Sequence, residues 1–371
     1  MLLIIIYYIS IFSLSFILTW FIIPLIRVVL LKNRLVQYPN DRSSHQKIVP
    51  SFGGLAFFLV FLIGVLITPE IIEKVFHSSK LGYINSLTMR ILIVISLIII
   101  VYTGVKDDNK ILSPFRKLLG QFASAGLIVS FDNFRIQSFY GLFSIHDIPL
   151  TLSIIISVVF VIAFMNAFNL IDGIDGNAAI NGISISFFFC FFFYHMDSMF
   201  FIGLSLMIIG TLSAFLRYNF SNTKKIFMGD TGSLTIGLVL SILALRLLNI
   251  QEYQFNFDFI EYHDLPIMIL TILFLPIIDV MRVVVIRIIN NKAIYKPDRN
   301  HIHHAIVDIG FSHRRASIII NTLNILFTYL VFLILSIYGT IAGILVFILI
   351  TLLCLIFLNS ITSKSLIKAN V

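Results

Sequence analysis

Residues 150–194 read LTLSIIISVVFVIAFMNAFNLIDGIDGNAAINGISISFFFCFFFY. Two apolar runs flank one polar stretch, NAFNLIDGIDG (166–176), which holds two carboxylates, two amides and two glycines. Because about 20 apolar residues in a helix span the hydrocarbon core of a bilayer, this segment predicts two membrane helices joined by a polar loop. A loop of this composition between two such helices is expected to lie at the membrane surface.

The same alternation of apolar and polar stretches covers the whole chain. Its 371 residues are 59% hydrophobic and 12% charged, which is too little charge to cover the surface of a soluble domain. The sequence therefore predicts an all-α polytopic membrane protein with one domain over residues 1–371. Eleven apolar segments are expected to cross the membrane: 2–31, 52–69, 87–105, 115–131, 150–166, 178–195, 199–216, 232–250, 265–289, 316–337 and 339–359.

The gaps between these segments differ in positive charge. With the N-terminus outside, the gaps on the cytoplasmic side and the C-terminal tail hold eighteen lysines and arginines. The gaps on the other side hold three, Lys74, Lys80 and Arg135. Lysine and arginine favour cytoplasmic loops. The sequence therefore predicts an outside N-terminus and a cytoplasmic C-terminus.

Polar residues concentrate in five of the cytoplasmic gaps, which predicts a single site at that face of the membrane. These clusters are DRSSHQKIVPSFGG (41–54), KDDNKILSPFRK (106–117), NAFNLIDGIDG (166–176), RYNFSNTKKIFMGDTGS (217–233) and KPDRNHIHHAIVDIGFSHRR (296–315). The outer gaps are plainer. One of them, FRIQSFYGLFSI (134–145), is expected to form a small hairpin around Gly141.

The residue types in these clusters suit phosphate chemistry with a hard metal ion. Asp107 and Asp108 end the third apolar segment, where carboxylates are costly unless they are used or solvated. Asp230 lies between Gly229 and Gly232 at the start of a helix, whose N-terminus favours an anion such as phosphate. Oxygen ligands with no cysteine nearby suit Mg²⁺ or Mn²⁺. Each motif alone also fits a structural role, as solvated loop acids or as a helix cap.

Three histidines lie within four residues, His301, His303 and His304. On a helix, His301 and His304 would share a face and His303 would point elsewhere. A zinc site is disfavoured, because the cluster has neither cysteine nor the HExxH spacing. Phosphate contact or proton transfer fits better beside Arg299.

The ninth apolar segment contains charges and prolines. Asp279 and Arg282 are three residues apart and are expected to pair with each other. Pro266 and Pro276 predict that this helix is kinked.

The five clusters, in this order, resemble the motifs of the polyprenyl-phosphate N-acetylhexosamine-1-phosphate transferases, known as glycosyltransferase family 4. The resemblance implies that undecaprenyl phosphate attacks the β-phosphorus of a UDP-N-acetylhexosamine and that UMP leaves. It implies Mg²⁺ as the cofactor, with Mn²⁺ as an alternative. It also implies a multi-pass protein of the bacterial inner membrane that contacts membrane lipid and no nucleic acid, with a homodimer left open.

The resemblance assigns roles on the sugar-nucleotide side. Asp230 and Asn169 would hold Mg²⁺ on the diphosphate. Asp175 would contact the uracil, and Phe227 would stack on it. The other substrate-binding candidates are Asn166, Asp172, Gly173, Asn219, His45 and Arg299.

On the acceptor side, the resemblance places Asp107 and Asp108 beside the lipid phosphate, and which of them acts on it stays open. Lys117 would neutralise phosphate charge. The histidines would bind the diphosphate or the acceptor. The catalytic candidates are thus Asp107, Asp108, Lys117, Asp230, His301, His303 and His304.

Two branches of this family differ in the histidine motif. The stretch PDRNHIHH (297–304) resembles the branch that uses UDP-N-acetylglucosamine and related sugars, rather than the branch that uses UDP-N-acetylmuramoyl-pentapeptide. That second branch is the alternative enzyme, and a transporter is the alternative that is not an enzyme. One departure is Asn177, which stands where the family more often has leucine, so the apolar lining of the acceptor pocket is in question there.

Overall fold

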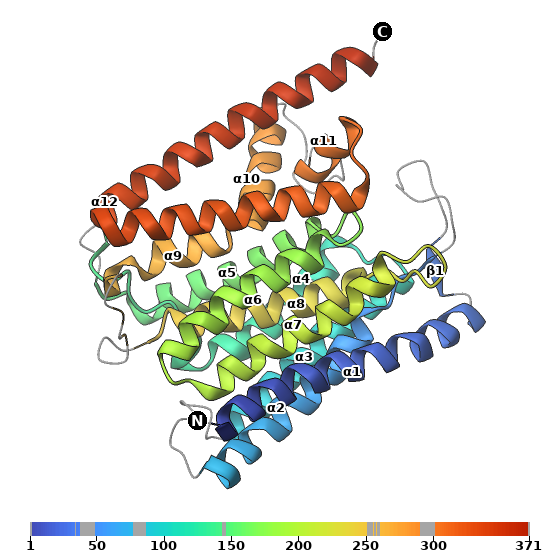
Figure 1. The fold of residues 1–371 in the computed structure, drawn as a ribbon, viewed down its shortest axis with the longest axis vertical. Coiled ribbons are helices and arrows are strands. Elements are labelled where there is room, and N and C mark those ends of the chain that lie inside the picture. Colours follow the sequence, from blue (N-terminus) through green and yellow to red (C-terminus); the bar gives the residue numbers. More distant parts are fainter. Residues whose placement is uncertain are drawn as a thin grey trace.

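The computed structural model shows a bundle of long helices (Figure 1). It describes residues 2–33, 35–37, 49–76, 87–142, 146–250, 255, 257, 260–289 and 301–369. The elements in these ranges are α1 (Leu2–Lys32), β1 (Val36–Gln37), β2 (Val49–Pro50), α2 (Gly54–Phe76), α3 (Leu87–Asn109), α4 (Pro114–Val129), η2 (Asp132–Phe134), α5 (Leu150–Leu170), α6 (Asn177–His195), α7 (Met199–Asn219), α8 (Gly229–Leu247), η5 (Tyr262–Asp264), α9 (Leu265–Ile272), α10 (Phe274–Ile289), α11 (Ile302–Asp308) and α12 (His313–Ala369).

The helices have the length and composition of membrane spans. Within the described ranges, eight helices are long and apolar enough to cross a membrane, or nine when α9 and α10 count together as one bent span. The prediction of an all-α polytopic membrane protein is confirmed. The predicted total of eleven crossings and the orientation stay predictions, since α4 has only 16 residues.

Helix α12 reverses direction at Gly339. This residue has φ 78° and ψ −179°, a backbone conformation that glycine adopts without the steric cost of a Cβ atom. The two arms lie one above the other in red and orange at the top of Figure 1. They correspond to the predicted segments 316–337 and 339–359, so the boundary between those segments is a sharp helical turn.

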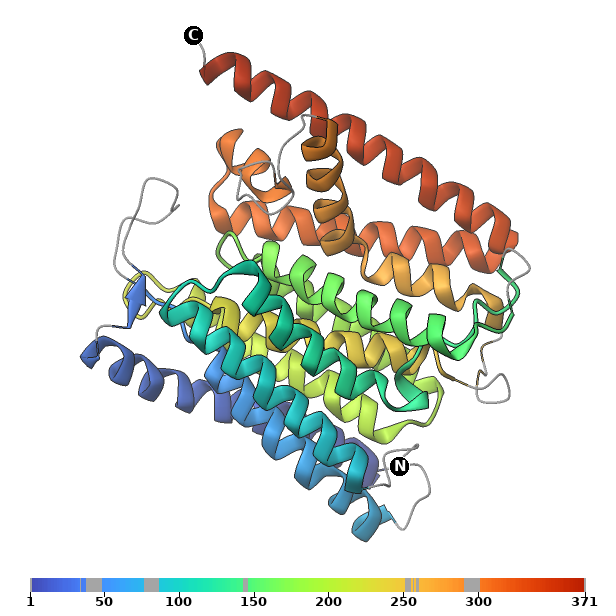
Figure 2. The same cartoon turned by 180° about the vertical axis from the view of Figure 1, so that it is seen from behind.

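The predicted kink in the ninth segment is a break between α9 and α10, whose axes differ by 65°. Pro276 lies in the first turn of α10 and has no N–H group for the carbonyl of Ile272, four residues earlier. The break turns α10 away from the bundle and toward α11 and α12 (Figures 1 and 2).

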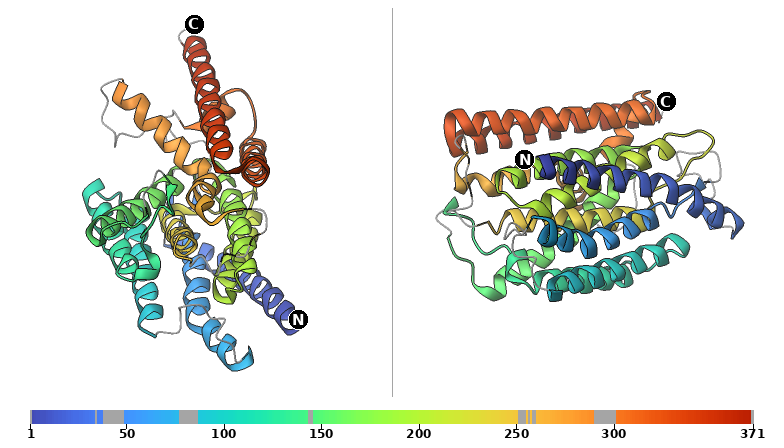
Figure 3. Two further views of the ribbon diagram at one scale, coloured as in Figure 1. Left: turned by 90° about the vertical axis from the view of Figure 1, so that its left-hand side faces the viewer. Right: turned by 60° about the horizontal axis from the view of Figure 1, so that its bottom comes forward.

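Helix α8 is the centre of the bundle. It is buried from Thr231 to Leu247, and it packs against α2, α3, α5 and α6 (Figure 3). Small residues allow this close packing: a Cβ atom at Gly104 of α3 would lie 2.5 Å from the Cα atom of Thr231. Likewise, a Cβ atom at Gly54 of α2 would lie 2.1 Å from the backbone nitrogen of Gly232. The first turn of α8 is therefore held against two neighbouring helices.

The two ends of the bundle carry different connections. At one end, β1 pairs with β2, and the backbone N–H of Phe227 donates to the carbonyl of Pro50 at 2.8 Å, so β2 lies against the segment that precedes α8. Helix α11 lies at the same end (Figure 1). At the other end, an isolated antiparallel bridge joins Ser138 and Asp147, which agrees with the predicted chain reversal near Gly141.

Candidate active site

The predicted loop between α5 and α6 is anchored by Asn219. Gly176 ends this loop in a left-handed conformation, with φ 80°. Its backbone N–H donates to Asn219 Oδ1 at 2.6 Å, and Asn219 Nδ2 donates to the carbonyl of Ile226 at 3.1 Å. One buried amide therefore joins the 171–176 loop to the segment that leads into α8.

Asp108 caps helix α8. Its carboxylate accepts hydrogen bonds from the backbone N–H of Asp230 at 2.9 Å and from that of Thr231 at 3.0 Å. It also accepts one from the Thr231 hydroxyl at 2.6 Å. A negative charge that satisfies the free N–H groups of a helix N-terminus stabilises that helix. The structure thus gives Asp108 a positioning role, because three donors of α8 already occupy its oxygens.

Replacing Asp108 with alanine is expected to destabilise the protein, because it leaves these donors of α8 without their acceptor. We expect a loss of about 2 kcal/mol in the free energy of unfolding, seen as a lower melting temperature in detergent. Asp132→Ala is the matched control, since Asp132 is an exposed carboxylate near the opposite end of the bundle. Equal melting temperatures for the two variants would contradict the capping role.

Lys117 lies between two carboxylates. Its Nζ atom is 3.0 Å from Asp107 Oδ2, and it also donates a hydrogen bond to Asp230 Oδ2. Asp107 comes from α3, Lys117 from α4 and Asp230 from α8, so three helices meet at one cation. The backbone N–H of Leu112 donates to Asp107 Oδ1 at 2.7 Å, which fixes the turn between α3 and α4.

Asn169 joins this group from the end of α5. Its Nδ2 atom donates to Asp230 Oδ1 at 2.9 Å and to Ser233 Oγ at 2.7 Å. The two residues that the resemblance implies as metal ligands are therefore in direct contact.

Burial, together with the neighbouring carboxylates of Asp230 and Asp108, raises the pKa of Asp172 well above its usual range.

The predicted uracil contact, Asp175, lies beside a lysine and a histidine. Lys225 Nζ forms an ion pair with Asp175 Oδ2, and His313 Nδ1 lies 3.7 Å from the same oxygen. Partial burial acts to raise the pKa of Asp175, but the hydrogen bonds from His313 and Lys225 outweigh it and the pKa is lowered. Lys225 also lies 5.4 Å from the ring centre of Phe227, so the two predicted uracil contacts share one lysine.

The three histidine rings lie side by side, which corrects the expectation that His303 points away from the other two. The His301 and His303 rings are parallel within 9° at 5.6 Å, and the His303 and His304 rings are 4.3 Å apart. The prediction fails because His301 precedes α11 in an extended conformation, with ψ 151°. Helical spacing therefore does not apply to it.

His303 is the most buried of the three histidines. It is 2% exposed, and neither ring nitrogen has a hydrogen-bond partner in the described part of the chain. Burial lowers the pKa of His303 to about 3, so its ring is neutral at pH 7. It packs on Gly173, where a Cβ atom would lie 2.1 Å from His303 Nε2. The histidine motif and the 171–176 loop are therefore in direct contact.

His301 is oriented by Asp279. Its Nδ1–H donates to Asp279 Oδ2 at 2.9 Å, and the backbone N–H of Ile302 donates to Asp279 Oδ1 at 2.7 Å. Sequence reasoning assigned Asp279 to a pair with Arg282 and missed this contact. The signal that could have found it is a lone carboxylate on an apolar helix that precedes a histidine motif.

One predicted residue, Asn166, bonds outside this group, and two others fall on residues that the structure does not describe. The Asn166 amide pairs with that of Gln121, at 2.9 and 3.0 Å, and also donates to the carbonyl of Ile162, so it joins α4 to α5. His45 and Arg299 lie outside the described residues. Sequence reasoning also missed Lys225. Its position two residues before Phe227 is the feature that could have identified it as a candidate site residue.

The donor atoms at Asp230 are all hard. No group of three His, Cys, Asp or Glu side chains within the described ranges has the geometry of a metal site. Asp230, Asn169 and Asp107 offer carboxylate and amide oxygens, which are the ligands that Mg²⁺ prefers in proteins. Asn169 uses its amide nitrogen for Asp230 and Ser233, so its carbonyl oxygen is the atom suited to a metal.

Fold and site together define an integral membrane protein with a carboxylate-rich site at one end of a helical bundle. The sequence profile of glycosyl transferase family 4 matches residues 90–248, which include Asp107, Lys117, the 171–176 loop and Asp230. A probable undecaprenyl-phosphate N-acetylglucosaminyl 1-phosphate transferase of Bacillus subtilis (strain 168) is 32% identical over 323 residues, covering 85% of this chain and 82% of the relative. The chain belongs to glycosyl transferase family 4.

Other relatives cover similar lengths. A decaprenyl-phosphate N-acetylglucosaminephosphotransferase of Mycobacterium leprae (strain TN) is 29% identical and covers 82% of this chain and 78% of its own. An undecaprenyl-phosphate alpha-N-acetylglucosaminyl 1-phosphate transferase of Escherichia coli (strain K12) is 26% identical and covers 79% and 75%. Both matches span most of each chain, so the likeness is not confined to one motif.

Proposed function

We propose that this protein transfers N-acetylglucosamine-1-phosphate from UDP-N-acetylglucosamine to undecaprenyl phosphate and releases UMP. The observation that carries the proposal is Lys117 held between Asp107 and Asp230, beside the N-terminus of α8. A lysine beside hard carboxylate oxygens suits the binding of phosphate groups together with a metal ion. The printed names of the relatives supply the donor and acceptor classes. The reaction would be the first membrane step in making a cell-envelope polysaccharide, for example an O-antigen.

We propose Mg²⁺ as the cofactor, held by Asp230 and Asn169, with Mn²⁺ as the alternative. The contact between these two side chains and their hard oxygen atoms supports this choice. When bound, the metal supplies positive charge to the diphosphate of the sugar nucleotide. Asp107 is then the carboxylate that remains to hold Lys117.

The protein's part in the transfer is to bind and position phosphates. An oxygen of the acceptor phosphate forms a bond to the β-phosphorus of the donor, and the bond from that phosphorus to the bridging oxygen breaks as UMP leaves. At pH 7 a phosphate monoester is already mostly ionised, so alignment outweighs proton removal. Lys117 neutralises phosphate charge, and Asp107 positions Lys117 for it. The bonds that Asp108 accepts from α8 favour Asp107 as the carboxylate that serves the acceptor.

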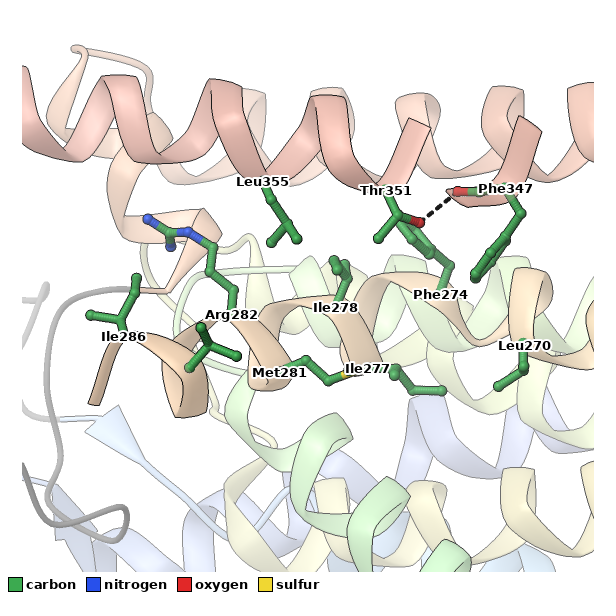
Figure 4. A pocket seen from close by; sticks show the side chains of 11 residues that line it. Leu270, Phe274, Ile277, Ile278, Met281, Arg282, Ile286, Phe347, Thr351 and Leu355 are labelled. Carbon is green, nitrogen blue, oxygen red and sulfur yellow. Dashed lines mark hydrogen bonds between the residues drawn. The ribbon is translucent and has the colours of Figure 1, made fainter. Parts of the chain in front are cut away.

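An apolar groove offers a path for the lipid chain of the acceptor. It lies between α10 and the second arm of α12, holds about 290 Å³, and is lined by Phe274, Ile278, Met281 and Phe347 (Figure 4). Arg282 lies toward one end of this groove, and Asp279, which orients His301, is three residues before it. We propose that the lipid chain lies along this groove with its phosphate toward the histidines.

We retain the topology expected from the sequence as part of the proposal. The chain would cross the bacterial inner membrane eleven times, with the N-terminus outside and the site at the cytoplasmic face, where UDP-sugars occur. The end of the bundle that holds Asp107, Lys117 and Asp230 would then face the cytoplasm. A homodimer is left open by this proposal.

UMP release tests the proposed reaction. Purified protein is supplied with undecaprenyl phosphate, Mg²⁺ and one of two donors, UDP-N-acetylglucosamine or UDP-N-acetylmuramoyl-pentapeptide. We expect release with the first donor alone. UMP release with the second donor alone would assign the protein to the peptidoglycan-precursor branch. If no UDP-N-acetylhexosamine gave UMP release, the result would favour a transporter.

Replacing Asp175 with alanine should weaken the binding of the sugar nucleotide. The variant loses the carboxylate that Lys225 and His313 hold in place, so we expect the KM for the UDP-sugar to rise about tenfold. The KM for undecaprenyl phosphate should stay unchanged, because the lipid groove lies on other helices. A raised lipid KM with an unchanged UDP-sugar KM would show that the uracil pocket is elsewhere.

A further inference from the structure

Helix α12 carries a row of polar side chains on the face that meets the 171–176 loop. His313, Ser317 and Asn321 are spaced four residues apart, so they lie along one side of the helix. Ser317 and Asn321 are fully buried or nearly so. Burying a polar group costs free energy unless the group is hydrogen-bonded. The hydrogen-bond partners of Ser317 and Asn321 therefore indicate the role of this face of α12.

Each member of the row contacts the loop or the start of α6. Ser317 Oγ donates to the backbone carbonyl of Asp175 at 2.7 Å, and His313 Nδ1 lies 3.7 Å from its carboxylate. Asn321 Nδ2 donates to Asn177 Oδ1 at 3.0 Å. Asn177 in turn donates from Nδ2 to the carbonyl of Ile171 at 2.9 Å, so this amide bridges the two ends of the loop.

Asn177 and Asn321 form a buried pair of amides between α6 and α12. Asn177 is 2% exposed, and its partner Asn321 is 1% exposed. A single buried asparagine without its partner would be destabilising, whereas the pair satisfies a donor and an acceptor at once. The two asparagines of this pair are 144 positions apart in the chain, so the bond joins distant segments.

The other end of the loop is also held by the C-terminal part of the chain. Gly173 lies against His303 of α11, and α11 packs on α12. The loop thus lies between the histidine motif at one end and Ser317 and Asn321 at the other. No other described element makes side-chain hydrogen bonds to both Asp175 and Asn177.

We infer that Ser317 and Asn321 are positioning residues that hold the donor loop so that Asp175 is placed for the nucleotide. This inference rests on the proposed function. It makes α12 part of the sugar-nucleotide site without contact to the reacting atoms. The helix carries this loop and, through α11, the histidine motif as one unit.

Kinetics of the double variant Ser317→Ala/Asn321→Leu test the inference. We expect the KM for the UDP-sugar to rise about tenfold, with kcat and the KM for undecaprenyl phosphate changed less than about twofold. Thr328→Val is the matched control: Thr328 is a buried polar residue two turns further along α12, bonded to α9 and α12 carbonyls rather than to the loop. It should leave all three constants unchanged. Ser317→Ala alone is the milder variant if the double variant folds poorly.

Hydrogen–deuterium exchange separates this inference from the proposed function, because it needs no substrate. Backbone amides of residues 171–177 should exchange about tenfold faster in the double variant than in the wild type or in Thr328→Val. Unchanged exchange, or a lower melting temperature with an unchanged UDP-sugar KM, would overturn the positioning role. Absence of UMP release by the wild type would refute the proposed function, while the exchange comparison would still decide the role of α12.

Discussion

Asp230→Asn is expected to lower UMP release about a thousandfold, with the protein still folded and inserted. The substitution keeps the size of the side chain and its contact with Asn169, but it removes the negative charge that faces Lys117. It also removes one of the two proposed ligands of Mg²⁺, so the diphosphate would lose its counter-charge. UMP release at saturating UDP-N-acetylglucosamine and undecaprenyl phosphate measures the effect.

Asp132→Asn is the control for this variant, because Asp132 is an exposed carboxylate paired with Arg135, near the end of the bundle opposite the site. It should retain full activity. Treating the wild type with EDTA should give the same loss as Asp230→Asn, and Mg²⁺ should restore only the wild type. Comparable activity in well-folded Asp230→Asn protein would refute the metal assignment.

The second large effect is expected for Lys117→Met. Lys117 contacts both Asp107 and Asp230, so its loss leaves two partly buried carboxylates facing each other without a cation. Breaking a buried ion pair from one side is destabilising by about 3 kcal/mol, and the partial exposure of this group reduces that cost. We expect UMP release to fall about a thousandfold, because the acceptor phosphate also loses its neutralising charge.

Lys117→Arg is the matched control for charge, because it keeps the cation but not its compact shape. It should recover part of the activity and most of the melting temperature. If Lys117→Met retained a tenth or more of the wild-type activity, Lys117 would be a structural ion pair rather than part of the site.

The sequence predicts which segments form the site, because composition is a local property. The apolar runs predict which segments cross the membrane. The distribution of lysine and arginine predicts that the five polar clusters lie at one face of the membrane. Asp107, Lys117, Asn169 and Asp230 come together in the structure as that single-face site requires. The hairpin of α12 was also visible, as two apolar segments that meet at residue 338.

Pairings within the site could not be predicted, because they depend on how helices pack. Asp107 and Asp108 are adjacent in the sequence, yet one faces Lys117 and the other caps a helix that starts 121 residues later in the chain, at Gly229. That difference follows from the close approach of α3 to α8 at Gly104, which no local pattern encodes. Likewise, the contact of His303 with Gly173 requires the turn between α11 and α12.

Isotopic labelling of the donor tests the proposed transfer most directly. UDP-N-acetylglucosamine labelled in both the β-phosphorus and the sugar is incubated with purified protein, undecaprenyl phosphate and Mg²⁺, and lipid and aqueous products are separated. We predict that both labels enter the lipid in a one-to-one ratio and that unlabelled UMP is released in the same amount. Sugar label in the lipid without the β-phosphorus, or no label in the lipid at all, would contradict the transfer of a sugar phosphate by this protein.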